Sequence, residues 1–273
     1  MDYILNNGEF TQFRDLIYES SGIHFYNSNR SILESRIKLK LKKNESLTIS
    51  DFYSLLKRDE QELKIFLDSI TTNLTRFFRN TAHFQSFEYH VIPELIKFKT
   101  KKNDNRIKIW SAGCSTGEEP YSIAIVLKEL LPRNFKSEIV ASDLSLKSLM
   151  TAKEGYYPEK RVNGIREKYL QRYFSKKDNG YLIKKEIKDM IKFDYHNLKF
   201  DSGLRNLDVI FCRNVIIYFD EAAQKNVISR FWDALSNHSY LFIGHSESLF
   251  GMDTKFEFLK TEWACLYRKF TGS

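Results

Sequence analysis

From about residue 105 onward, short β-like runs alternate with segments of helical periodicity, and this alternation restricts the possible folds more than any other feature. The predicted strands are the apolar runs RIKIWSA (106–112), EIVASD (138–143), LDVIFCRNV (207–215) and SYLFIGHSE (239–247). Predicted helices follow the first three of these strands, at 118–131, 146–155 and 221–235. This order predicts a doubly wound parallel sheet that binds its ligand at the carboxyl ends of the strands.

The rest of the chain predicts smaller units. Residues 1–72 carry apolar residues at helical spacing and predict a helical N-terminal domain, in which Asn29 caps a helix. The alternation IKLKLK (37–42) on that helix also resembles a strand. Short β-like pieces in 181–198 predict a small β insertion at about residues 172–194, and the tail predicts a hairpin.

Composition limits the classes of function. The formal net charge of +8 favours an acidic partner, and five bases with no acid lie in RIKLKLKK (36–43). This run is either a solvated helix face or a docking surface. Nucleic acid is less favoured, because no aromatic residues alternate with these bases.

Other sequence features argue against export, membrane insertion and metal binding. The N-terminus lacks the pattern of a signal peptide, and no apolar run approaches the roughly 18 residues of a membrane span. The three cysteines form no C-x-x-C pair, which fits a reducing cytoplasm without disulfides. The six histidines show no H-x-x-x-H spacing, so we expect no metal site.

The segment WSAGCSTGEEPYS (110–122) joins the first predicted strand to the first predicted helix, where nucleotide-type cofactors bind in such sheets. Its spacing matches neither G-x-G-x-x-G nor the phosphate-binding P-loop. Glu118 and Glu119 suit a helix N-terminus even without a ligand, but they would repel a phosphate. A cofactor with a positive charge and a ribose but no phosphate fits this loop, and S-adenosylmethionine has that chemistry.

Polar residues follow two other predicted strands. Asp143 ends the second strand, where an acid commonly receives the two ribose hydroxyls, and Ser145 could cap the next helix in its place. Arg213 and Asn214 follow a buried strand at the sheet's carboxyl edge. A buried arginine without a role is costly, which makes this pair a candidate part of the site.

The segment TTNLTRFFRNTAHF (71–84) lies just before the sheet domain and has two interpretations. It is either an interdomain linker anchored by Phe77 and Phe78, or a polar lid over the cofactor. The side chains of the lid would be Asn73, Thr75 and Arg79.

Five segments carry a long and specific pattern: TTNLTRFFR, WSAGCSTGEEPYSIAI, ASDLSLKSLMTAKEGYY, FCRNVIIYF and FIGHSESL. In order and spacing they resemble the chemotaxis receptor methyltransferases, the CheR family, over nearly the whole chain. The resemblance implies an all-α domain (1–72) and a Rossmann-like, S-adenosylmethionine-dependent methyltransferase domain (73–273). It also implies methyl transfer to glutamate side chains of bacterial chemoreceptors, giving methyl esters and S-adenosylhomocysteine.

The resemblance further implies the site residues. Its cofactor contacts fall on Asn73, Thr75, Arg79, Glu119, Asp143, Asn197, Leu198, Arg213 and Asn214. Arg79 and Tyr218 match the positions near the transferred methyl group. Whether Glu119 or Glu118 binds the methionine ammonium stays open. A glutamate substrate is ionised at neutral pH, with a reference pKa of about 4.3, so the reaction needs no general base.

Chemoreceptor methylation regions are acidic helices, so the basic helix becomes a predicted docking face. Its bases are Arg36, Lys38, Lys40, Lys42 and Lys43. We expect a monomeric bacterial cytoplasmic enzyme, recruited to membrane receptor arrays, whose insertion holds no receptor peptide because it lacks a glycine-rich extension. Two alternatives remain: a nucleic-acid methyltransferase, for which an N-P-P-Y motif is missing, and a non-catalytic cofactor-binding signalling module.

Overall fold

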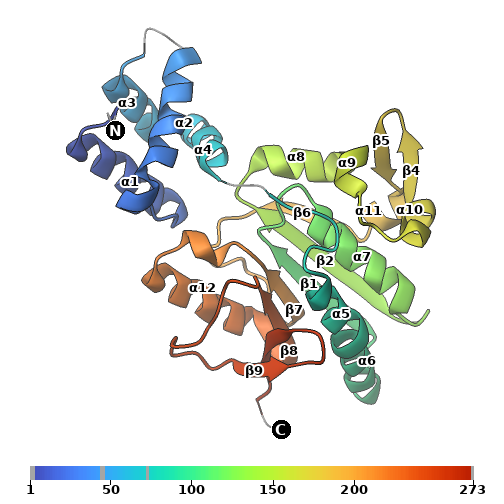
Figure 1. Ribbon diagram of the computed structural model, residues 1–273. Coiled ribbons are helices and arrows are strands. Elements are labelled where there is room, and N and C mark those ends of the chain that lie inside the picture. The colour runs from blue at the N-terminus through green and yellow to red at the C-terminus, as the bar shows by residue number, and fades with distance from the viewer. Residues whose placement is uncertain (1–3, 44–46, 72–73, 272–273) are drawn as a thin grey trace.

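The computed structural model describes residues 4–43, 47–71 and 74–271. Its N-terminal part is a group of helices beside a larger body built around a sheet, as Figure 1 shows. These helices are α1 (Asn7–Ser21), α2 (Arg30–Lys43), α3 (Ile49–Arg58) and α4 (Glu60–Ile70), with a short 3₁₀ turn, η1 (Asn27–Asn29), before α2.

Local capping and aromatic packing explain why this N-terminal unit is helical. Asn6 and Glu9 form a reciprocal capping box at the start of α1, and Thr48 and Asp51 do the same for α3. The core of the unit consists of side chains from all four helices, including Phe13, Ile17, Leu33, Ile37, Phe52 and Phe66. Burial of these residues outweighs the strand-like alternation at 37–42, and that segment is helical.

The predicted N-cap of α2 is wrong. Asn29 directly precedes this helix, but its buried side-chain oxygen accepts no hydrogen bond among the described residues. The preceding 3₁₀ turn continues into α2 with helical backbone angles at Arg30, so the chain enters the helix without an extended capping residue.

The larger body contains a seven-stranded mixed sheet with the order β6-β2-β1-β7-β8-β10-β9. Its strands are β1 (Arg106–Ala112), β2 (Lys136–Asp143), β6 (Ile191–Tyr195), β7 (Leu207–Cys212), β8 (Leu235–Ile243), β9 (Glu257–Lys260) and β10 (Cys265–Lys269). Strands β6, β2, β1, β7 and β8 are parallel, whereas β10 pairs antiparallel with β8 and β9. The predicted doubly wound fold is confirmed, and so is the terminal hairpin.

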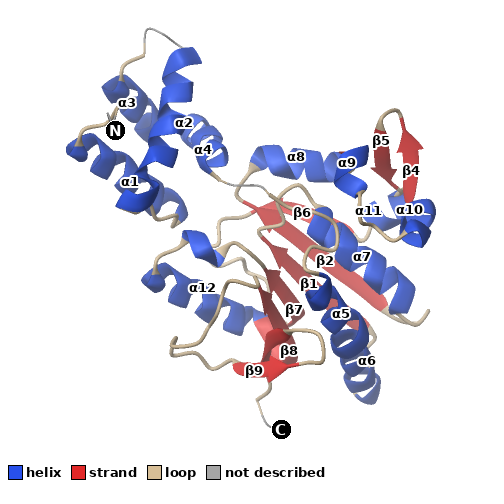
Figure 2. Ribbon diagram, in the orientation of Figure 1, coloured by secondary structure: helices blue, strands red, loops and turns tan. Residues whose placement is uncertain are grey.

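Helices cover both faces of this sheet, as Figure 2 shows. One face carries α5 (Thr81–Ser86), η2 (Phe87–Val91), α6 (Ile92–Lys101), α7 (Glu118–Leu130) and α8 (Leu146–Glu154). The other face carries α12 (Glu221–Ala234). Alternate residues of a strand enter opposite cores: Ile109 packs toward the α7 face, and Trp110 toward α12.

A second, three-stranded sheet lies apart from the central one (Figure 2). Its elements are β3 (Tyr156–Pro158), α9 (Glu159–Val162), α10 (Glu167–Tyr173), β4 (Phe174–Lys177), β5 (Gly180–Ile183) and α11 (Lys185–Lys188). The predicted insertion at 172–194 is therefore wrong at both ends. The small sheet already begins at Tyr156, and the strand at 191–195 joins the central sheet beside β2. The local sequence of a short strand does not show which sheet it joins.

Several backbone groups of the N-terminal unit contact the sheet domain. The N–H of His24 donates to the carbonyl of Tyr218 over 2.9 Å, and Ile23 forms an antiparallel bridge with Phe219. The side chain of Asn197 donates to the carbonyl of Ser20 over 2.8 Å. These contacts hold the end of α1 against the loops at the carboxyl edge of the sheet.

In the part of the chain that the structure describes, no helix combines the length and the apolar character needed to cross a bilayer. Cys114 and Cys212 are buried free thiols, and Cys265 is an exposed one.

Candidate cofactor and active site

A pocket of about 910 Å³, partly open to solvent, lies at the carboxyl ends of β1, β2 and β7. The connection after β1 leads toward β2, while the connection after β7 leads toward β8, so the order of the strands reverses between them. Such switch points are where doubly wound sheets bind ligands.

The loop after β1 forms one wall of the pocket. The N–H groups of Gly113 and Cys114 donate to the carbonyl of Ser142 over 2.8 and 2.9 Å, which ties this loop to the end of β2. Gly113 has a φ of +83°, and a Cβ at this position would collide with Val215. Glycine therefore lets the loops after β1 and β7 approach each other at the switch point.

Glu119 lies in the first turn of α7 and lines the pocket. Its carboxylate accepts hydrogen bonds from Ser111 Oγ over 2.8 Å and from Arg213 Nη1 over 3.2 Å. Burial raises the pKa of Glu119, and the charge of Arg213 opposes that rise. The Arg213 side chain is only 2% exposed, and burial lowers its pKa. The pair places one negative and one positive charge at the pocket wall.

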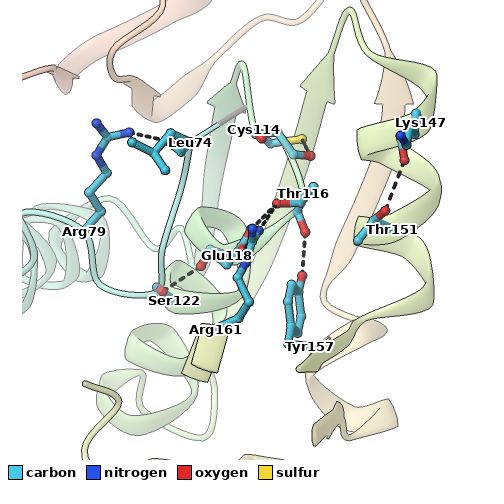
Figure 3. A network of polar contacts seen from close by, with 11 residues as sticks. Leu74, Arg79, Cys114, Thr116, Glu118, Ser122, Lys147, Thr151, Tyr157 and Arg161 are labelled. Carbon is cyan, nitrogen blue, oxygen red and sulfur yellow. Dashed lines mark hydrogen bonds and ion pairs between the residues drawn. The ribbon is translucent and has the colours of Figure 1, made fainter. Parts of the chain in front are cut away.

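Glu118 has a different environment, which Figure 3 shows. This residue is fully buried and does not line the pocket. Its carboxylate accepts hydrogen bonds from Arg161 and from Thr116 Oγ1, and Tyr157 donates to the Thr116 carbonyl over 2.6 Å. Of the two adjacent acids, the structure therefore presents Glu119 to the pocket and uses Glu118 to tie the loop to the small β sheet.

Asp143 ends β2 and also lines the pocket. Its two carboxylate oxygens accept hydrogen bonds from the N–H groups of Ser115 (2.7 Å) and Ser145 (2.8 Å). Burial raises the pKa of Asp143, and these two hydrogen bonds oppose the rise. Ser145 is the N-cap of α8, where it accepts from the N–H of Ser148, so Asp143 does not cap this helix.

The segment between α4 and α5 combines the features of both interpretations of 71–84. Phe77 is buried against Tyr157 and Phe174, which anchors the segment to the small β sheet. The neighbouring Thr75 and Arg79 line the pocket. Asn73 lies outside the described residues.

Arg79 sits between two residues in an unusual backbone conformation. Phe78 and Asn80 have φ values of +49° and +61°. The Arg79 side chain donates to the carbonyl of Leu74 over 2.7 Å (Figure 3), and its own carbonyl accepts from Arg213. Non-glycine residues with positive φ cost about 1–3 kcal/mol each and persist where the surroundings impose them.

The remaining predicted cofactor residues also lie at this pocket; they are Asn197, Leu198 and Asn214, together with Tyr218. The Asn197 side chain already contacts Ser20, and its oxygen accepts from the N–H of Lys199 over 2.9 Å. The pocket thus gathers residues from six separate stretches of the chain.

Sequence reasoning missed several pocket residues. Ser21 and Ile23 come from the N-terminal unit, and only the interdomain contact brings them to the pocket. No local pattern in the sequence marks them. His196 precedes Asn197 and lines the pocket as well; burial lowers its pKa, so this ring is neutral at physiological pH. Its position directly after a strand was an available signal.

The side chains of the pocket fit S-adenosylmethionine. Ser115 Oγ and Arg213 Nε are buried and have no hydrogen-bond partner among the described residues, so polar groups remain for a ligand. Glu119 and Asp143 offer carboxylates for an ammonium and for ribose hydroxyls. Among the described residues, no cluster of three or more histidine, cysteine or acidic side chains could hold a metal ion.

The predicted docking bases lie on α2, away from the pocket wall. Arg36, Lys38 and Lys42 are exposed, beside the half-exposed Ile32 and Leu39. Lys40 instead pairs with Glu62 of α4 over 2.9 Å. The side chain of Lys43 lies outside the described residues.

Two family models match the chain in succession. The CheR methyltransferase all-alpha domain matches residues 8–71, and the CheR methyltransferase SAM binding domain matches residues 73–265. The chain belongs to the CheR methyltransferase family. A relative from Borreliella burgdorferi named chemotaxis protein methyltransferase is 36% identical over 257 residues, which is 90% of each chain.

Other CheR relatives are similar over most of their length. Chemotaxis protein methyltransferase 2 of Vibrio cholerae is 31% identical over 99% of this chain and 94% of its own. The Escherichia coli chemotaxis protein methyltransferase is 32% identical over 92% of this chain and 88% of its own. The chain is therefore a chemotaxis-type methyltransferase with an S-adenosylmethionine-binding domain.

Proposed function

We propose that this enzyme transfers a methyl group from S-adenosylmethionine to glutamate side chains on the cytoplasmic methylation helices of chemoreceptors, giving methyl esters and S-adenosylhomocysteine. The observation that carries this proposal is the placement of Arg79 at the same pocket as Glu119 and Asp143. A cation beside a cofactor pocket is suited to holding an anionic nucleophile, and a glutamate carboxylate is such a nucleophile.

The pocket residues divide between the two ends of the cofactor. Glu119 would bind the methionine ammonium, and the unpartnered Nε–H of Arg213 is available for the methionine carboxylate. Asp143 would accept hydrogen bonds from the ribose hydroxyls, while Leu198 and Asn197 would flank the adenine. Thr75 and Asn214 complete the wall. Asn73 keeps the cofactor contact that the family resemblance implies.

The reaction requires alignment more than proton transfer. S-adenosylmethionine supplies an electrophilic methyl group on a sulfonium, and a glutamate carboxylate is already ionised at pH 7, with a reference pKa of about 4.3. Arg79 would orient the carboxylate oxygens, and the hydroxyl of Tyr218 would fix one of them. The nearby His83 is no general base at neutral pH, because burial and the charge of Arg213 lower its pKa to about 3.

The exposed face of α2 would dock the receptor. Arg36, Lys38 and Lys42 are exposed on α2, where Lys38 and Lys42 lie one turn apart on the same face. Their positive charge would complement the acidic methylation helices of a receptor. The half-exposed Ile32 and Leu39 lie among these bases and could contact apolar side chains of the same helices.

The proposal is tested by following a labelled methyl group. The protein and labelled S-adenosylmethionine are incubated in parallel reactions, each with one acceptor: chemoreceptor-rich membranes, RNA or DNA. We expect label on the receptors, released as methanol by mild alkali, as for a methyl ester. Label on nucleic acid would instead favour a nucleic-acid methyltransferase. Cofactor binding without transfer to any receptor would favour a non-catalytic module.

The role of Arg79 gives a sharper prediction. Replacing Arg79 by Ala should lower receptor methylation by about 100-fold, since misplacing a reacting group by about 1 Å can cost that much. Arg133→Ala is the matched control, because Arg133 is exposed in the loop between α7 and β2. Circular dichroism should show both variants folded. Methylation by Arg79→Ala at the rate of the control would contradict the assignment.

A further inference from the structure

The loop after β7 carries Arg213, Asn214 and Tyr218 to the pocket, and one carboxylate holds its backbone. Glu247 Oε1 accepts from the N–H groups of Val215 (3.0 Å) and Ile217 (3.2 Å). Its Oε2 accepts from the N–H groups of Asn214 (2.8 Å) and Gly244. Four backbone donors from two loops therefore converge on a single side chain.

The space around this carboxylate is closely fitted. A Cβ on Gly244 would collide with Glu247 Oε2 and would lie 2.8 Å from the Asn214 nitrogen. Asn214 itself has a φ of +60°, a conformation that turns successive N–H groups toward the carboxylate. Glycine at 244 and the positive φ at 214 both serve this arrangement.

The carbonyl groups of the same loop have other partners. Gln224 Nε2 donates to the carbonyls of Ile216 (3.0 Å) and Phe219 (2.9 Å), and the N–H of His24 donates to that of Tyr218. The N–H side of the loop needs an acceptor with several lone pairs and no hydrogen of its own. An ionised carboxylate has these properties, and an amide does not.

We propose that Glu247 is a positioning residue for the cofactor site. It fixes the backbone of Asn214–Ile217, and through it the place of Arg213 beside Glu119 and of Tyr218 at the pocket. Glu247 does not line the pocket, so it acts through the loop and not through contact with the ligand. The part of this proposal that concerns Tyr218 rests on the proposed methyl transfer, whereas the part that concerns Arg213 rests on cofactor binding alone.

Glu247→Gln tests this idea, with Glu257→Gln as the matched control. Glutamine keeps the shape but turns an NH₂ group toward backbone N–H donors, whereas Glu257 pairs with Arg268 at the surface of β9. We expect Glu247→Gln to weaken calorimetric binding of S-adenosylhomocysteine at least tenfold. The kcat for receptor methylation should fall at least tenfold at saturating cofactor. The KM for receptor should stay within twofold, because α2 is unchanged.

Two comparisons keep the result decisive. Glu247→Asp retains the carboxylate on a shorter side chain and should recover part of the affinity that Glu247→Gln loses. If the role of Glu247 were only structural, both variants would have a lower melting temperature. Their affinity and kcat would then be unchanged at temperatures where they are folded. A lower melting temperature with unchanged affinity and kcat would overturn the proposal. Wild-type affinity and kcat in Glu247→Gln would overturn it as well. If the unmodified enzyme methylates no receptor, the proposed function fails, yet the affinity comparison still decides the role of Glu247.

Discussion

Glu119 holds a negative charge where desolvation opposes it. Burial raises the pKa of this carboxyl, and Arg213 and Ser111 stabilise the ionised form. Each of its oxygens accepts one hydrogen bond from the protein and keeps a lone pair for a further donor. This arrangement suits a group that must remain ionised to attract a cationic cofactor.

The raised pKa predicts a pH dependence for cofactor binding. In the role proposed for Glu119, cofactor binding needs the ionised carboxylate, so affinity should be constant well above the raised pKa and should fall as the pH drops through it. That fall begins at a higher pH than for a glutamate with the ordinary value of 4.5. Glu119→Gln should bind S-adenosylhomocysteine about 30-fold more weakly at neutral pH, because a charged hydrogen bond contributes about 2 kcal/mol.

Calorimetric titrations at several pH values check this prediction. Glu138→Gln is the control, because Glu138 is an exposed carboxylate on β2. Glu138→Gln should bind with the affinity of the unmodified protein and lose affinity as steeply at low pH. In Glu119→Gln, affinity should fall less steeply as the pH decreases. An equally steep loss of affinity in Glu119→Gln would assign the dependence to another group, with Asp143 as the next candidate, since burial raises its pKa too.

At the scale of elements, the loop between β1 and α7 is held from outside the central sheet. Arg161 of α9 pairs with the fully buried Glu118, and Tyr157 of β3 donates to the Thr116 carbonyl. The three-stranded sheet and α9 therefore support the loop through Tyr157 and Arg161 (Figure 3). The position of this sheet and that of the cofactor loop should be energetically coupled.

Removing Arg161 should destabilise the protein. Arg161→Met leaves the buried Glu118 carboxylate without its cation, which costs roughly 3 kcal/mol in comparable buried pairs. Urea unfolding measures the loss. The double variant Arg161→Met with Glu118→Gln should recover part of it, because the buried charge is then gone.

Arg172→Met is the control for this measurement. Arg172 of α10 pairs with Glu129, but its side chain is 64% exposed. Exposed pairs of this kind contribute at most about 1 kcal/mol. If Arg161→Met and Arg172→Met lowered the free energy of unfolding equally, the pair of Arg161 with Glu118 would contribute no more than an exposed ion pair. Absence of recovery in the double variant would show that the cost lies elsewhere than in the unpaired charge.

At the scale of the whole molecule, the N-terminal unit presents two separate surfaces. Ser21 at the end of α1 and the following Ile23 line the pocket, whereas the proposed docking bases lie on the exposed face of α2. In our proposal, receptor docking and cofactor binding therefore use separate parts of one unit.

This separation predicts how charge and salt affect catalysis. Lys38→Gln with Lys42→Gln should raise the KM for receptor about fivefold, which corresponds to about 1 kcal/mol for two exposed charges, and should leave kcat unchanged. Added salt should raise the KM of the unmodified enzyme, because ions screen exposed charges beyond about 8 Å at physiological ionic strength. The variant should respond less to salt.

Lys97→Gln with Lys101→Gln is the matched control, since these exposed lysines have the same four-residue spacing on α6. Methylation kinetics at several salt concentrations compare the two pairs. A KM that rises equally in both variants would point to net charge alone. An unchanged KM in Lys38→Gln with Lys42→Gln would remove α2 from the docking surface.

The sequence by itself determined the alternation of the main strands and helices of the central sheet. Alternation of apolar runs and helical periodicity predicted β1, β2, β7 and α7 close to their observed bounds, because burial on both faces of a sheet leaves a continuous apolar run in each strand. The family motifs placed Glu119, Asp143 and Arg213 among the candidates.

Only the tertiary structure decided three features that depend on contacts between distant segments: the sheet that residues 191–195 join, the start of α2, and the partners of Glu118 and Glu119. Residues 191–195 joined the central sheet because β2 had a free edge for them, and Asn29 lost its capping role because η1 runs directly into α2. The same long-range packing turned Glu118 away from the pocket toward Arg161, and Glu119 into it toward Arg213. Two adjacent acids are equivalent in a sequence, and their partners across the fold distinguish them.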